Sequence, residues 1–181
     1  MNRNQNKIPK LSWSEKDILG QKALQQELWN LIEKDTGNPL LVDWAAKLIK
    51  KLNVPERDEL ALAKAVQKYS QDHIKFFREY PERFTSPLRT AVWGIGDCDD
   101  KARFISSILR TFRIPIRLKF IRFEITKNGI TKKVSHVYPQ AKINNEWISL
   151  ESVHKWPIGL DPENLAKRKG IIPKVDYIGD A

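Results

Sequence analysis

The only cysteine of this 181-residue chain, Cys98, lies among carboxylates in the stretch WGIGDCDDKARF. Asp97 is suited to cap a helix that begins at Cys98, and Asp100 then falls at the third helical position, where an acidic side chain can bond back to the cap. A thiol at a helix start lies beside unpaired backbone amides, which favour the thiolate. The carboxylates oppose that ionisation, so we expect a nucleophilic Cys98 to need a cationic partner, most simply a histidine.

The pattern of two predicted strands singles out His136 from the three histidines of the chain. His136 lies in KKVSHVYPQAKI, which is followed by Asn144 and Asn145, a pair that tolerates the positive φ angles of a two-residue turn. We therefore predict strands over 134–143 and 146–150. The histidines in SQDHIKFF and ESVHKW are interpreted as surface or core residues.

The predicted turn fixes which residues of the two strands face each other: Ile143 with Glu146, Ala141 with Ile148, and Tyr138 with Glu151. Alternate residues share a face, so one face is apolar and comprises Val137, Ala141, Ile143, Ile148 and Leu150. The other face is polar and comprises His136, Tyr138, Gln140, Ser149 and Glu151. His136 and Glu151 are then diagonal neighbours, with Cα atoms about 7–8 Å apart. Cys98, His136 and Glu151 thus have the residue types of a nucleophile, a base and an acid that orients the base.

Each of these residues also has an ordinary structural interpretation. A lone cysteine is more often buried and inert than nucleophilic, and a lone strand histidine is usually a satisfied polar group. A metal site built from His136 and the aspartates beside Cys98 is disfavoured, because adjacent aspartates at a helix start diverge and already serve as caps. We therefore expect no metal ion and no cofactor.

Hydrophobic periodicity predicts a chain that is helical in its first half. Residues 1–12 are predicted to be a flexible tail, and helices are predicted from Ser14 to the break at TGNPL, over 41–52, and from NVPERDEL, with Pro55 in its first turn, towards Phe77. The stretch YPERFTSPLRTAVWGIG is predicted to be a loop. Residues 13–56 then form a helical extension, and 57–181 form the core with a C-terminal tail.

The second half of the chain changes character. Apolar residues at steps of three and four predict one amphipathic helix over 97–112. RIPIRLKFIRFEI alternates as a strand does and then loses phase near Ile121, which predicts a bulge, and KNG predicts a hairpin turn. Helices followed by a helix and an antiparallel sheet give an α+β fold.

Composition and charge narrow the class of protein. The length suits one well-packed domain, no apolar run approaches the roughly 18 residues of a membrane span, and the polar N-terminus shows no signal peptide, so we expect a cytoplasmic protein without a membrane partner. The net charge of +10 is local: between Lys101 and Lys133 there are ten Lys and Arg against one acid, Glu124. This basic strip would suit an acidic partner, and we consider nucleic acid an unlikely ligand because no stacking motif accompanies it.

The stretches GDCDDKARFISSILRTFRIPIRLKFI, SHVYPQAKINNEWISLE and SPLRT resemble the transglutaminase-like superfamily, over about residues 60 to 160. The resemblance is strongest to phage- or prophage-encoded members. It implies a papain-like core, a protein or peptide substrate, and acyl transfer on an amide or peptide bond through a Cys98 thioester, with His136 as base and Glu151 as third member. The family usually has aspartate where this chain has Glu151. The backbone amide of Cys98 would supply one oxyanion donor, and Trp93 and Tyr69 are candidates for the second.

Two other functions stay open at this point. The chain could be a non-enzymatic binding or assembly protein, including a phage structural protein, that keeps the superfamily core as an inactive scaffold. The basic strip could instead bind RNA or DNA, which predicts affinity that falls steeply with salt.

Overall fold

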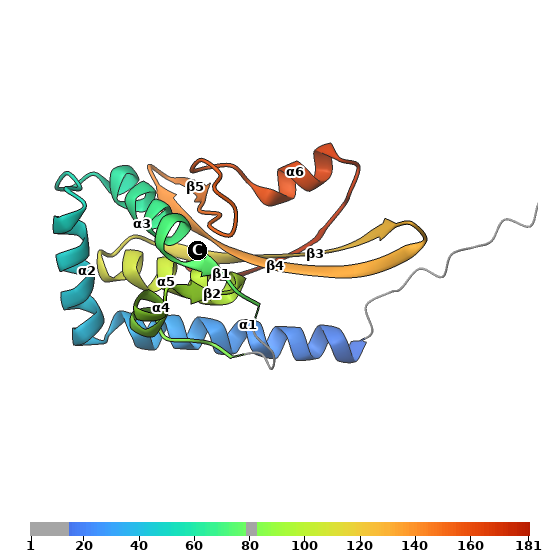
Figure 1. Ribbon diagram of the computed structural model, residues 1–181, viewed down its shortest axis with the longest axis horizontal. Coiled ribbons are helices and arrows are strands. Elements are labelled where there is room, and N and C mark those ends of the chain that lie inside the picture. Colours follow the sequence, from blue (N-terminus) through green and yellow to red (C-terminus); the bar gives the residue numbers. More distant parts are fainter. Residues whose placement is uncertain (1–14, 79–82) are drawn as a thin grey trace, which may run out of the picture.

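The computed structural model describes residues 15–78 and 83–181 (Figure 1). Its elements follow the order α1 (Glu15–Thr36), α2 (Pro39–Lys51), α3 (Glu59–His73), β1 (Lys75–Phe76), α4 (Pro87–Trp93), β2 (Ile95–Gly96), α5 (Cys98–Thr111), β3 (Ile116–Lys127), β4 (Ile130–Ile143), β5 (Glu146–Ser149), α6 (Pro162–Arg168) and β6 (Lys174–Gly179). Helices dominate the first half and an antiparallel sheet the second, which confirms the predicted α+β class. The predicted tail over 1–12 and the predicted helix start at Ser14 lie outside the described residues.

The main sheet has the strand order β5-β4-β3-β6, and all its neighbours are antiparallel. β5 pairs only with residues 140–143 of β4, and β6 pairs only with residues 117–122 of β3. The paired ends of β3 and β4 therefore extend past the rest of the sheet, and Figure 1 shows them as a long two-stranded arm that leaves the body of the molecule. We call residues 123–134 the arm.

One hydrophobic core joins the N-terminal helices to the sheet. It contains Leu28 and Ile32 of α1, Leu41 of α2, Ile105 of α5 and Leu118 of β3. A buried ion pair between Arg103 of α5 and Asp35 of α1, with Nε and Oδ2 at 2.6 Å, ties the same helices together. The extension predicted over 13–56 thus shares its interior with the helix that begins at Cys98.

The helices differ from the predictions mainly at their ends. α3 begins at Glu59 rather than near Pro55, because the Asp58 side chain accepts a hydrogen bond from the Ala61 amide and caps the helix there. It ends at His73 instead of continuing to Phe77, and the next residues form β1, which pairs in parallel with β2. The stretch predicted as a loop contains α4, which Gly94 ends with a left-handed φ of 65°.

The strand predictions were right about the turns and wrong about the bulge. Asn144 and Asn145 have φ angles of 52° and 64°, as a two-residue turn requires. β3 and β4 pair without interruption through Ile121, so the predicted bulge is absent from these positions. Phe120 and Ile121 are both buried because both faces of the sheet are covered there, and this breaks the alternation in the sequence. The C-terminal part of the core, for which only a tail was predicted, contains α6 and the strand β6.

The basic strip between Lys101 and Lys133 is not one surface. Several of its cations are paired with acids of the same chain: Arg103 binds Asp35, Lys119 binds Asp161 and Glu163, Arg122 binds Asp176, and Arg110 binds Asp180. Basic side chains near the turn of the arm are exposed. The exposed cations of the strip are therefore Arg113, just after α5, and the lysines of the arm. Among the described helices, none is long and apolar enough to cross a bilayer.

Candidate active site

Cys98 is the first residue of α5, at the position predicted from the sequence. The Asp97 side chain accepts a hydrogen bond from the Asp100 amide at 3.4 Å and caps the helix. Asp100 in turn accepts a hydrogen bond at 2.6 Å from the backbone amide of Thr85, which ties the helix start to the segment before α4. Gly96 is required here, since a Cβ atom at this position would lie 2.8 Å from the Asp100 Cβ. All three aspartates beside Cys98 are buried, and Asp97 and Asp100 have structural roles.

His136 and Glu151 meet as the predicted register requires. The observed pairs Ala141 with Ile148 and Ile143 with Glu146 are those expected, and Leu150 donates its amide to the Pro139 carbonyl just beyond β5. The Nε2 atom of His136 lies 2.5 Å from Oε2 of Glu151. The His136 side chain is 18% exposed and the Glu151 side chain only 1%. The imidazole is therefore accessible to solvent, whereas the carboxylate is buried.

Backbone amides hold the Glu151 carboxylate from the other side. Its Oε1 atom accepts hydrogen bonds from the amides of Val153 at 2.5 Å and His154 at 3.3 Å. Burial raises the pKa of Glu151, but the hydrogen bond and charge of His136 and these two amides outweigh it, so the pKa is lowered. Glu151, which stands where the resemblance leads us to expect an aspartate, is therefore ionised and held in one orientation.

Two side chains of helix α3 form hydrogen bonds with the segment that carries Glu151. The side-chain amide of Gln67 donates to the Glu151 carbonyl at 2.6 Å, and that of Gln71 donates to the carbonyls of Glu151 at 3.0 Å and Trp156 at 2.8 Å. Sequence reasoning missed both residues. A signal existed, because Gln67 lies in the buried stripe of α3 that includes Ala63 and Val66.

Lys101 connects α5 to the same helix. Its ammonium is buried and donates to the carbonyls of Ser70 at 2.8 Å and Ile74 at 2.5 Å, at the carboxyl end of α3. Burial lowers the pKa of Lys101 to about 8, and the negative charge of Glu151 opposes part of that shift. Helix α3 thereby bridges the helix of Cys98 and the segment of Glu151.

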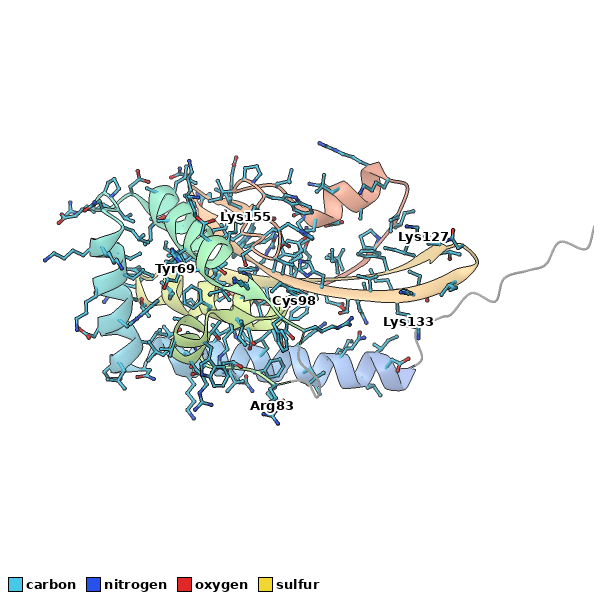
Figure 2. All side chains as sticks on the ribbon, in the orientation of Figure 1. Tyr69, Arg83, Cys98, Lys127, Lys133 and Lys155 are labelled. Atoms are coloured by element: carbon cyan, nitrogen blue, oxygen red, sulfur yellow. The ribbon has the colours of Figure 1, made fainter. Side chains whose placement is uncertain are left out.

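A groove of about 990 Å³ brings the three predicted site residues to one surface, since Cys98, His136 and Glu151 all line it. Figure 2 shows Cys98 near the middle of the molecule, where the arm meets the body. The two oxyanion candidates are not among the groove-lining residues: Trp93 stacks under Arg89, and Tyr69 stacks on Phe104 in the interior.

Solved structures of other proteins share the fold of this chain. No curated protein matches the sequence. Among solved structures, calcium-bound LapG of Legionella pneumophila has a TM-score of 0.50 at 17% identity, covering 82% of this chain and 80% of that protein. A candidate cysteine protease from Cytophaga hutchinsonii has a TM-score of 0.50 at 17% identity, with 78% of this chain and 48% of that one covered.

A third structure, a candidate protease from Parabacteroides distasonis, has a TM-score of 0.54 at 12% identity and covers 84% of this chain and 30% of its own. The present chain therefore spans less than half of either candidate protease, and identities this low show a shared fold. The model of the transglutaminase-like superfamily core matches residues 46–152. The chain belongs to the transglutaminase-like superfamily.

Proposed function

We propose that the chain is a cysteine-dependent hydrolase of amide or peptide bonds that works through a thioester on Cys98. The observation that carries the proposal is the shared groove: the thiol at the start of α5 and the imidazole held by Glu151 line the same surface. The fold shared with candidate cysteine proteases supports a peptidase over other acyl transfers.

In this proposal the two nitrogens of His136 have different tasks. Because Nε2 lies against Glu151, Nδ1 is left to exchange a proton with Cys98. The thiolate attacks the substrate carbonyl carbon, and the amide C–N bond breaks as Nδ1 protonates the leaving amine. The imidazole then takes a proton from water, which attacks the thioester and releases the acid and the thiol. The Cys98 amide, at the helix start, is an oxyanion donor in both steps.

Alkylation of Cys98 by iodoacetamide between pH 5 and 8 tests the first requirement. We expect wild type to react faster than a small-molecule thiol at the acidic end of that range, and His136→Ala to lose the advantage. Mass spectrometry of the Cys98 peptide gives the rates. A wild-type rate no higher than that of the small thiol at every pH would disprove the proposal and favour the non-enzymatic scaffold.

A second assay separates hydrolysis from transamidation. The enzyme is incubated with a mixture of peptides, with and without a fluorescent primary amine. Hydrolysis predicts new peptide termini in both samples, whereas transamidation predicts products that carry the amine. The similarity to phage-encoded members stays a prediction.

A further inference from the structure

The outer edge of β4 is open from Val137 towards the arm. β5 pairs with residues 140–143, and Leu150 makes the last bond to this edge, with its amide 2.9 Å from the Pro139 carbonyl. The chain then turns away, because the Glu151 carboxylate accepts the amides of Val153 and His154. Among the described strands, none pairs with this side of β4 beyond that point.

The register shows which backbone groups face the open edge. The Lys142 amide donates to the Pro115 carbonyl, so even-numbered residues of β4 bond to the β3 side. The Pro139 carbonyl accepts from Leu150, so odd-numbered residues bond outwards. Pairing with β3 is uninterrupted, and the same alternation therefore directs outwards the N–H and C=O groups of Thr131, Lys133, Ser135 and Val137. This row of donors and acceptors flanks His136.

The groove follows this edge. Its lining includes every residue from 132 to 137 of β4, together with Leu24 of α1 and Leu165 of α6. Successive side chains of a strand point to opposite faces, so six consecutive residues line one groove only where it reaches the edge of the strand. A chain that lies in the groove therefore lies beside the open backbone groups, with Cys98 at its inner end.

The charged and apolar residues that line the groove indicate which kind of chain it can bind. The basic residues of the groove include Lys132, four residues along the strand from His136, and Lys169 just after α6. Lys133 also lines the groove, and its ammonium contacts Asp17 of α1 at 3.4 Å. Its acids, Asp97, Asp99 and Glu151, all lie at the Cys98 end. Phe120, Phe123 and Leu165 add apolar surface. The outer groove thus suits a chain with apolar and acidic side chains.

We infer that the substrate is an extended protein segment, rich in apolar and acidic residues, that pairs backbone to backbone with the β4 edge over residues 131–137. Such strand addition gives affinity through main-chain hydrogen bonds and specificity through alternate side chains. The inference rests on the proposed function and names its substrate class. It excludes an isolated glutamine side chain on a folded surface as the main acyl donor, because that donor leaves the edge unpaired.

The test uses two tetrapeptide libraries, one with a chloromethyl ketone at the carboxyl end and one with a chloroacetyl group at the amino end, so that either side of the scissile bond is sampled. Labelling of Cys98 is compared with labelling by iodoacetamide, which has no backbone to pair. Ser135→Pro removes an outward N–H while keeping the bonds between β3 and β4. Thr126→Pro is the matched control, because even-numbered residues of β3 face the opposite edge of the arm, where Asp180 bonds to Ile116.

We expect Ser135→Pro to lower the ratio of the preferred-peptide labelling rate to the iodoacetamide rate about 10-fold, the effect of one backbone hydrogen bond. Thr126→Pro should change neither rate. Peptides with Glu or Asp should react faster than those with Lys or Arg, and salt should reduce the difference.

Each other outcome is decisive. Fast iodoacetamide labelling with no peptide preferred, or a preference that Ser135→Pro leaves intact, overturns the inference but not the proposed function. Slow iodoacetamide labelling of wild type overturns the proposed function itself. If light scattering shows a wild-type dimer that Ser135→Pro converts to a monomer, the edge binds a second copy of the chain instead, and the inference is overturned.

Discussion

The Glu151 carboxylate contacts His136 through one oxygen, at 2.5 Å, and the amides of Val153 and His154 through the other. One buried side chain therefore orients the imidazole and turns the backbone away from the edge of β4. The extra methylene of glutamate relative to the aspartate usual in the family lets the carboxylate reach both sets of partners.

Shortening this side chain should separate its two tasks. Glu151→Asp cannot span both the two amides and His136, so we expect the iodoacetamide rate of Cys98 near neutral pH to fall by about 10-fold or more. Glu151→Gln keeps the length but loses the charge that stabilises an imidazolium, and we expect a similar loss. Alkylation rates across the pH range, followed by mass spectrometry, measure both. Glu151→Asp reacting at the wild-type rate would show that the longer side chain has no such role.

The lowered pKa of Glu151 makes part of the stability dependent on pH. In the unfolded chain this carboxyl titrates near 4.5 and in the folded protein below it. Its contribution is therefore present above pH 4.5 and is lost as the pH falls through the folded value. Urea unfolding should give wild type a steeper loss of stability than Glu151→Gln in this acidic range. The exposed Glu33→Gln serves as control and should follow wild type; equal slopes for all three would contradict the prediction.

Local chemistry explains what was predictable about the site. Asn144 and Asn145 specify a two-residue turn, the turn specifies the register, and the register brings His136 next to Glu151. The cap at Asp97 likewise depends only on neighbouring residues. These features need no knowledge of the rest of the chain, so the α+β class and the pairing within the site could be read from the sequence.

Contacts between distant segments explain what was missed. Gln67 meets the Glu151 carbonyl across 84 residues of sequence, and β6, near the carboxyl terminus, pairs with β3. Their partners are backbone atoms, which every residue carries, so no residue type marks them. The false bulge at Ile121 has the same origin. The start of α6 lies against the face of β3 that the alternation assigned to solvent, where Lys119 pairs with Asp161 and Glu163.

Lys101 should make stability depend on pH in the alkaline range. Its pKa is about 8 in the folded protein and near 10.5 when unfolded, because burial disfavours the ammonium. Between these values the unfolded chain binds more protons, so the free energy of unfolding rises with pH. Lys101→Met removes this dependence. We expect urea unfolding to show wild type gaining stability relative to Lys101→Met from pH 8 upwards, and a constant difference would contradict the assigned pKa.

The wall of the groove formed by α6 depends on a buried ion network beneath it. Lys119 of β3 contacts Asp161 at 2.8 Å and Glu163 at 2.6 Å, and Asp161 also accepts from the Tyr138 hydroxyl at 2.7 Å and caps α6. The two carboxylates raise the pKa of Lys119 against the lowering effect of burial. The network therefore holds α6 against the outer face of the sheet.

Removing the Lys119 cation from this network should destabilise the packing of α6 on the sheet more than it destabilises the rest of the fold. Lys119→Met leaves two carboxylates largely buried without their main counter-charge, which costs about 3–5 kcal/mol, whereas Tyr138→Phe removes one neutral donor at about 1–2 kcal/mol. Urea unfolding gives the totals, and hydrogen exchange gives their location. Amides of α6 should lose protection first in Lys119→Met, while those of α5 stay protected. If α5 and α6 lost protection together, the network would be part of the global core rather than a local attachment of the groove wall.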